Sequence, residues 1–133
     1  MRLLFDECTP RDLAPYLLPH VVEFVEELGW KGKQNGQLLQ LASASGRFDV
    51  LVTTDVNLYS QQEVALYGLG VLVLRAYRNS FEALLPLTEQ ALEKLETLPP
   101  GTLEFLYNEQ RLRESDRRRK RGPFATNRQK DNP

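Results

Sequence analysis

The chain is poor in cysteine and histidine and has no long apolar run, and each scarcity removes a class of function. One cysteine, Cys8, cannot form an internal disulfide, and with a single histidine it cannot supply the ligands of structural zinc. The lone His20 also argues against Ser-His-Asp or Cys-His catalysis. We therefore expect any catalysis to depend on carboxylates.

Two further absences concern location. No run of 18 apolar residues is present, so we expect no membrane-spanning helix and no membrane partner. The N-terminus lacks a basic region followed by an apolar run and a small-residue cleavage site, so we expect no secretory signal. Both absences favour a cytoplasmic protein. With 133 residues, 41% of them hydrophobic, the chain suits one domain with a real core.

Charge is divided unequally along the chain. Residues 111–133 contain nine Lys/Arg and three Asp/Glu, a net charge of +6, whereas residues 1–110 carry −7, which leaves −1 overall. An acidic body with a basic tail favours binding of the tail to phosphate backbones or to an acidic partner; the alternative is a solvated tail without a partner. The candidate nucleic-acid contacts are Arg117, Arg118, Arg119, Lys120 and Arg121.

Apolar segments of strand length alternate with helical patterns through most of the chain. We expect a domain over residues 1–114 and a disordered tail over residues 115–133. Pro86 should kink the last helix or mark its true start. The expected strands are residues 2–5, 20–25, 49–54 and 70–74, and the expected helices are 9–18 (capped by Thr9), 35–45, 60–67 and 80–98. Residues 102–107 and 110–113 could pair as a C-terminal hairpin.

Strands without a polar face, joined by helices, predict an α/β fold with a mainly parallel sheet covered on both sides, a three-layer sandwich. Right-handed crossovers leave few topologies, and the strand order 2-1-3-4 is the one we expect. In that order the first and third strands are neighbours, and the order of the strands reverses between them. Ligands bind at such a switch point, outside the carboxyl ends of the strands.

Acidic residues follow both of these strands. Asp6 and Asp55 come directly after the first and third strands, and Glu7 stands beside Asp6. Two carboxylates about 4 Å apart repel each other by roughly 4 kcal/mol at an effective dielectric constant near 20, so such a cluster needs protons or divalent cations. Oxygen ligands select hard ions such as Mg²⁺ or Mn²⁺. The alternative is that each aspartate only caps a helix or forms a turn.

Five short segments together resemble the small stand-alone PIN-like proteins, relatives of VapC-type toxins. Leu4 to Pro10 resembles their opening hydrophobic-Asp-Glu-x-x-Pro, and Val50 to Asp55 resembles their Val-Leu-Val-Thr-x-Asp. His20 to Val22 and Gly70 to Leu74 are similar to their second and fourth strands. Gly32 to Ala42 is similar to their Gly-x-x-Asp-x-x-hydrophobic-hydrophobic-x-x-Ala segment. The resemblance covers about residues 1–105, and the order and spacing of the segments agree throughout.

The resemblance implies a metal-dependent endoribonuclease, often the toxin of a toxin–antitoxin pair. Carried over, Asp6 and Asp55 would be catalytic metal ligands, and Glu7 an accessory catalytic carboxylate. Asn35 and Asn57 stand where the family has acids, and we expect their neutral carbonyl oxygens to complete the shell of a Mg²⁺ or Mn²⁺ ion. Each lost charge weakens cation binding, and the second metal site is the one most affected.

Two functions therefore stay open. In the first, the protein hydrolyses RNA phosphodiesters and is held inactive by a small antitoxin. In the second, it is a catalytically weakened PIN-like module that binds RNA or an antitoxin without turnover. The sequence leaves open whether the chain forms a homodimer.

Overall fold

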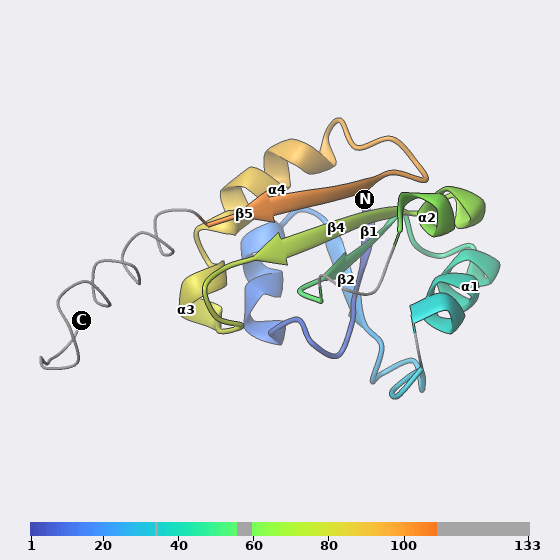
Figure 1. The fold of residues 1–133 in the computed structure, drawn as a ribbon. Helices are drawn as coiled ribbons and strands as arrows, with labels where there is room; N and C mark the ends of the chain where they lie inside the picture. The colour runs from blue at the N-terminus through green and yellow to red at the C-terminus, as the bar shows by residue number, and fades with distance from the viewer. Residues whose placement is uncertain (34, 56–59, 109–133) are drawn as a thin grey trace, which may run out of the picture.

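The computed structural model describes residues 1–33, 35–55 and 60–108 (Figure 1). Strands and helices alternate along the chain as the sequence predicts. The elements, in order, are β1 (Arg2–Phe5), η1 (Arg11–Leu17), β2 (Val21–Phe24), α1 (Asn35–Ser45), β3 (Val50–Thr53), α2 (Gln61–Tyr67), β4 (Gly70–Arg75), α3 (Phe81–Leu84), α4 (Leu87–Leu95) and β5 (Leu103–Tyr107).

The five strands form one sheet in which every neighbouring pair is parallel, in the order β2-β1-β3-β4-β5. The first four lie in the predicted order, so the switch point falls between β1 and β3. The predicted order was incomplete, because β5 extends the sheet beyond β4, from the pair Val71 and Leu103 to the pair Arg75 and Tyr107.

The expected first arm of the hairpin contains a strand. Residues 103–107 form β5, which pairs in parallel with β4 and is the last strand of the described sheet. The second arm at residues 110–113, the domain boundary at residue 114 and the basic tail all lie outside the described residues.

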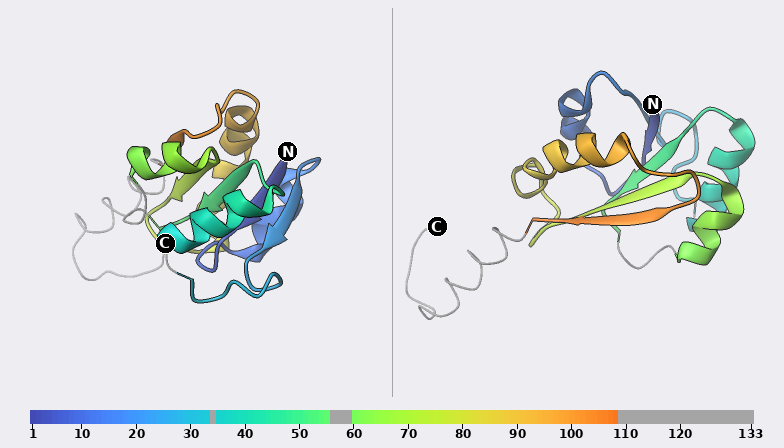
Figure 2. Two further views of the ribbon diagram at one scale, coloured as in Figure 1. Left: turned by 90° about the vertical axis from the view of Figure 1, so that its right-hand side faces the viewer. Right: turned by 90° about the horizontal axis from the view of Figure 1, so that it is seen from above.

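Helices cover both faces of the sheet, as a parallel sheet without a polar face requires (Figures 1 and 2). Side chains alternate along each strand, so Leu3 and Phe5 of β1 face one layer and Leu4 the other. The first face packs against η1, α3 and α4, and the second against α1 and α2. The result is the predicted α/β three-layer arrangement.

Most helix boundaries follow the local sequence signals. Ser60 and Glu63 form the capping box that starts α2, and Gly68 ends it with φ 74°, a conformation that favours glycine. Pro86 separates α3 from α4 and precedes the first residue of α4, so it marks a true start. Within the described ranges, no helix has the length and apolar character needed to span a membrane.

The helix expected over residues 9–18 is the exception. The segment forms a 3-10 helix, η1, preceded by Pro10, and the Thr9 side chain does not cap it. Pro15 lies inside η1, and it lacks the N–H that an α-helix would pair with the carbonyl of Arg11. Thr9 instead donates a hydrogen bond to the carboxylate of Asp6, three residues earlier in the chain, and this contact replaces the predicted cap.

Candidate functional site

The carboxyl ends of β1 and β3 bring Asp6 and Asp55 to one edge of the sheet. The N–H of Asp6 donates to the carbonyl of Val52 over 3.3 Å, continuing the ladder between the two strands. The Thr53 hydroxyl donates to Oδ2 of Asp6 and accepts the N–H of Asp55 at 3.1 Å. One hydroxyl therefore connects the Asp6 carboxylate with the backbone of Asp55. The two aspartates are neighbours, as the sequence predicts.

Asp6 is buried, with 8% of its surface exposed, and two threonines hold its side chain. The Thr9 hydroxyl donates to Oδ1 over 2.7 Å, and the Thr53 hydroxyl donates to Oδ2. Burial raises the pKa of Asp6, although the hydrogen bonds from Thr53, Thr9 and the Cys8 and Thr9 backbones act in the opposite direction. The ionised side chain is thus fixed in orientation but poorly solvated, a state that a nearby cation would stabilise.

Three carboxylates surround the thiol of Cys8. Burial raises the pKa of this thiol, and so do the nearby negative charges of Asp6, Asp55 and Glu7. These acids follow the neighbouring strands β1 and β3, at the carboxyl end of the sheet. We call Asp6, Glu7 and Asp55 the acidic edge.

Glu7 connects the acidic edge to the loop before α1. Its Oε1 accepts the N–H of Gly32 over 2.6 Å. Gly32 has φ 81°, so the chain turns here in a conformation that favours glycine. This contact brings the segment that leads into α1, which starts at Asn35, toward the acids. The Asn35 side chain and all of Asn57 lie outside the described residues, so two of the four predicted metal ligands have no described position.

The donor set suits a hydrated hard ion better than a closed metal cage. Across residues 1–33, 35–55 and 60–108, no group of three or more His, Cys, Asp or Glu side chains could hold a metal ion by itself. Mg²⁺ commonly keeps several waters and is bound by one or two carboxylates together with substrate phosphates. Asp6 and Asp55 provide two such carboxylates, and the Thr53 hydroxyl beside them is a further hard oxygen. Among the described residues, Asp6 and Asp55 are thus the carboxylates that could hold such an ion.

Several residues that organise this edge were missed from the sequence. Thr54 and Asn79 both donate to the carbonyl of Cys8, over 3.2 and 2.8 Å. Together they tie the loop after β1 to β3 and to the loop after β4. Polar residues at the end of an otherwise apolar strand were a signal for Thr53 and Thr54. Asn79 is 71 residues from Cys8 in the chain, and no local pattern marks it.

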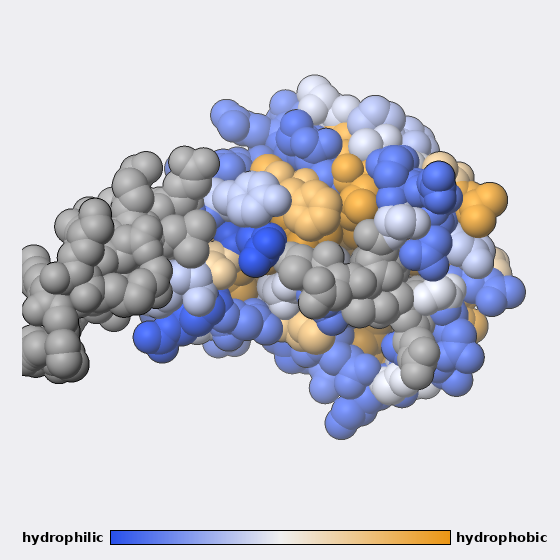
Figure 3. Space-filling model, in the orientation of Figure 1, coloured by the Kyte–Doolittle hydropathy of each residue, from blue (hydrophilic) through white to orange (hydrophobic). Residues whose placement is uncertain are grey.

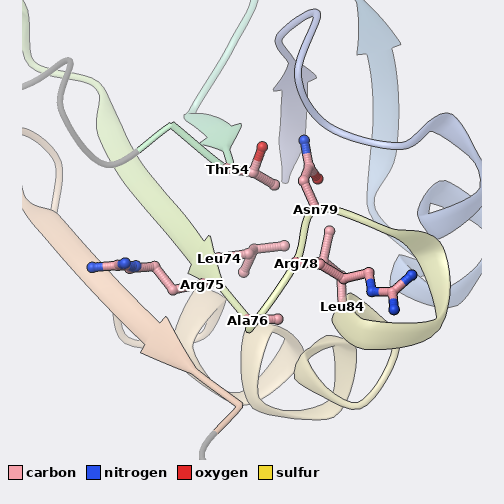
Figure 4. Close-up of a pocket in the computed structure, with 7 residues that line it drawn as sticks. All are labelled: Thr54, Leu74, Arg75, Ala76, Arg78, Asn79 and Leu84. Carbon is pink, nitrogen blue, oxygen red and sulfur yellow. The ribbon is translucent and has the colours of Figure 1, made fainter. Parts of the chain in front are cut away.

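A small pocket of about 120 Å³ adjoins the acidic edge (Figure 4). Thr54 and Asn79 lie side by side at one end of it, so the pocket begins at the Cys8 loop. Arg75 and Arg78 also line it, and their guanidinium groups extend to opposite sides, that of Arg75 toward β5. The remaining lining residues are Leu74, Ala76 and Leu84. Acidic and basic groups thus occupy neighbouring positions at the carboxyl end of the sheet.

Comparisons of this chain with protein-family models, with curated proteins and with solved structures found no match. The arguments for function therefore come from the chain itself. The basic run, Arg117 to Arg121, lies outside the described residues, and its assignment to nucleic-acid binding stays a prediction from sequence.

Proposed function

We propose that the protein is a metal-dependent endoribonuclease of the PIN-like kind. The observation that carries the proposal is Asp6, a buried carboxylate fixed by two threonine hydroxyls and linked through one of them to Asp55. A carboxylate kept in a poorly solvated position beside other carboxylates costs stability, and such groups are more common at functional sites than elsewhere. Its place at the switch point of a parallel sheet is where such folds bind ligands.

In this proposal Asp6 and Asp55 hold one Mg²⁺ or Mn²⁺ ion. When bound, the ion supplies an activated water and neutralises charge on a phosphodiester. Thr9 and Thr53 keep the Asp6 carboxylate in one orientation, so it needs little rearrangement to bind. Glu7, anchored on Gly32, is the accessory carboxylate. Asn35 and Asn57 add neutral oxygens where the PIN-like pattern has acids, which predicts weak metal affinity.

RNA and a small antitoxin are the proposed partners. The acidic body repels RNA, and the cationic residues after position 110 supply the missing attraction. An antitoxin would hold the nuclease inactive, which is the arrangement implied by the resemblance to VapC-type toxins.

The test is cleavage of a labelled single-stranded RNA in Mg²⁺, in Mn²⁺ and in EDTA. We expect cleavage by the wild type with either metal, none in EDTA, and none by the Asp6→Asn, Asp55→Asn double variant. Glu89→Gln removes an exposed carboxylate on α4 and is the matched control; it should cleave like the wild type. Equal cleavage by the wild type and the double variant would refute the proposal.

The second candidate is a module that binds RNA or an antitoxin without turnover. The asparagines at positions 35 and 57 favour it, as does the lack of a three-acid group among the described residues. In this case the wild type would bind RNA but leave it intact at every metal concentration tested.

A further inference from the structure

Two aromatic rings on β5 form a flat surface at the edge of the sheet. Phe105 and Tyr107 are two residues apart and so share one face of the strand. Their ring centroids are 6.3 Å apart and their planes differ by 15°, so the rings lie nearly parallel. Tyr107 is 46% exposed and Phe105 is half-buried. Hydrophobic colour gathers over β5 in the face shown in Figure 3.

A cation lies beside these rings. Arg75 is the register partner of Tyr107 on β4, and its guanidinium carbon is 5.9 Å from the Tyr107 ring centroid. The guanidinium therefore lies over the aromatic ring and carries its positive charge to the same surface. We call Phe105, Tyr107 and Arg75 the stacking platform.

The stacking platform and the acidic edge both lie at the carboxyl end of the parallel sheet. Arg75 belongs to both the platform and the pocket lining. At its other end, the pocket is lined by Asn79, whose amide donates to the carbonyl of Cys8 beside the acids. β5 lies two strands from β3, which is about 10 Å at the usual strand spacing. A few nucleotides would cover this distance.

This combination fits single-stranded nucleic acid. Unpaired bases stack on aromatic rings whatever their sequence, and arginines beside the rings attract the phosphates. In a duplex the bases stack on one another and offer no free faces. Charge complementarity points the same way, because Arg75 and Arg78 line the pocket and the cationic segment of the chain follows Asn108, the residue after Tyr107.

We propose that the stacking platform binds unpaired bases of single-stranded RNA next to the phosphodiester at the acidic edge. The inference rests on the proposed function for its substrate, and it adds that the substrate must be unpaired near the cleaved bond. Specificity for single strands then comes from Phe105 and Tyr107, whereas cleavage depends on Asp6 and Asp55.

The experiment measures binding of the full chain to a fluorescent single-stranded RNA by anisotropy in EDTA, so that binding is separated from cleavage. Tyr107→Ala should weaken binding by roughly 5- to 150-fold, and Tyr107→Phe should restore it to within about twofold. Tyr16→Ala is the matched control, because Tyr16 on η1 is similarly exposed but packs against Phe81 of α3. Tyr16→Ala should bind RNA like the wild type. The thermal unfolding curve of each variant should also resemble that of the wild type.

Each result decides one of the two proposals. Loss of binding in Tyr107→Ala, with no cleavage by the wild type in metal, would support the platform and refute the nuclease. If the wild type cleaves RNA in metal and Tyr107→Ala binds RNA as tightly as the wild type, the platform proposal is refuted and the nuclease proposal is not. The rings would then serve packing or a protein partner. Binding of a duplex of the same sequence as tightly as the single strand would also overturn the platform.

Discussion

Replacing Asp6 by asparagine should make the metal-free protein more stable at neutral pH. Burial raises the pKa of Asp6 above the 3.8 expected of an unperturbed carboxyl. Between these two pKa values the folded chain binds more protons than the unfolded chain. The free energy of unfolding therefore falls as the pH rises through this interval, and at neutral pH the full penalty applies.

The magnitude follows from the same linkage. Each unit by which the folded pKa exceeds the unfolded pKa corresponds to about 1.4 kcal/mol lost at neutral pH. The raised pKa already includes the threonine hydrogen bonds, which lower it, so the net effect of ionisation is unfavourable. We expect Asp6→Asn to raise the free energy of unfolding and the melting temperature at pH 7, because the ionised carboxylate is the less stable form in the folded chain.

Asparagine preserves the geometry that makes this comparison valid. The Thr9 hydroxyl can still donate to the side-chain carbonyl of the amide. The Thr53 hydroxyl would accept from the amide nitrogen in place of donating, since a hydroxyl has two lone pairs besides its proton. The substitution therefore removes a charge without opening a cavity, but the proton of the buried Thr53 hydroxyl then needs another acceptor, because that oxygen also accepts the N–H of Asp55.

The assay is thermal unfolding of the wild type and Asp6→Asn, followed by circular dichroism in EDTA from about pH 4 to about pH 8. The stability difference should be small at the acidic end and widen toward neutral pH. Saturating Mn²⁺ should then reverse it, because an ion at 100 times its dissociation constant stabilises the wild type by about 2.7 kcal/mol and the variant much less. A variant that is less stable than the wild type at pH 7, by an amount independent of pH, would refute the reasoning and make Asp6 a structural residue.

Two further predictions concern the two asparagines that stand where the PIN-like pattern has acids, and the basic residues after Ser115. Asn35→Asp together with Asn57→Asp should raise the affinity for Mn²⁺ by at least tenfold in a calorimetric titration, because each added carboxylate contributes charge to the ion's shell; an unchanged affinity would place both residues away from the ion. Truncation after Ser115 should weaken RNA binding and flatten the dependence of log affinity on log salt, since the removed residues carry seven Lys/Arg and two Asp/Glu. An unchanged salt slope would exclude a role for the tail.

The parts of the fold that the sequence predicts are those set by local patterns. Apolar strands such as residues 50–53 have no polar face and therefore require a parallel sheet with two covered sides. The Ser60 and Glu63 pair satisfies the first backbone donors of α2 wherever that helix packs. Right-handed crossovers left few strand orders, and the expected one places β1 beside β3, so that Asp6 and Asp55 follow neighbouring strands.

The parts that the sequence does not predict depend on partners distant in the chain. Thr9 has every local property of a helix cap, but its hydroxyl contacts Asp6, three residues earlier, and the carbonyl of Val52 on β3, 43 residues later. The second contact exists only after β1 and β3 have paired. Asn79 reaches Cys8 only because β4 lies beside β3. Local preference loses in both cases to a tertiary hydrogen bond that satisfies a polar group at the end of the sheet.

The segment at residues 103–107 has both a local pattern and a distant strand partner. Its weak alternation suggested one arm of a hairpin, because antiparallel strands commonly have one solvated face. The strand is parallel. Leu103 and Phe105 pack against the core on the side of α1 and α2, whereas Tyr107 at the end of the strand is 46% exposed. The pattern therefore reflects exposure at the end of β5. A bound ligand would remove these exposed aromatic rings from water. Because Tyr107 at the end of β5 lies beside Arg75, nucleic-acid bases are chemically suitable ligands for this surface.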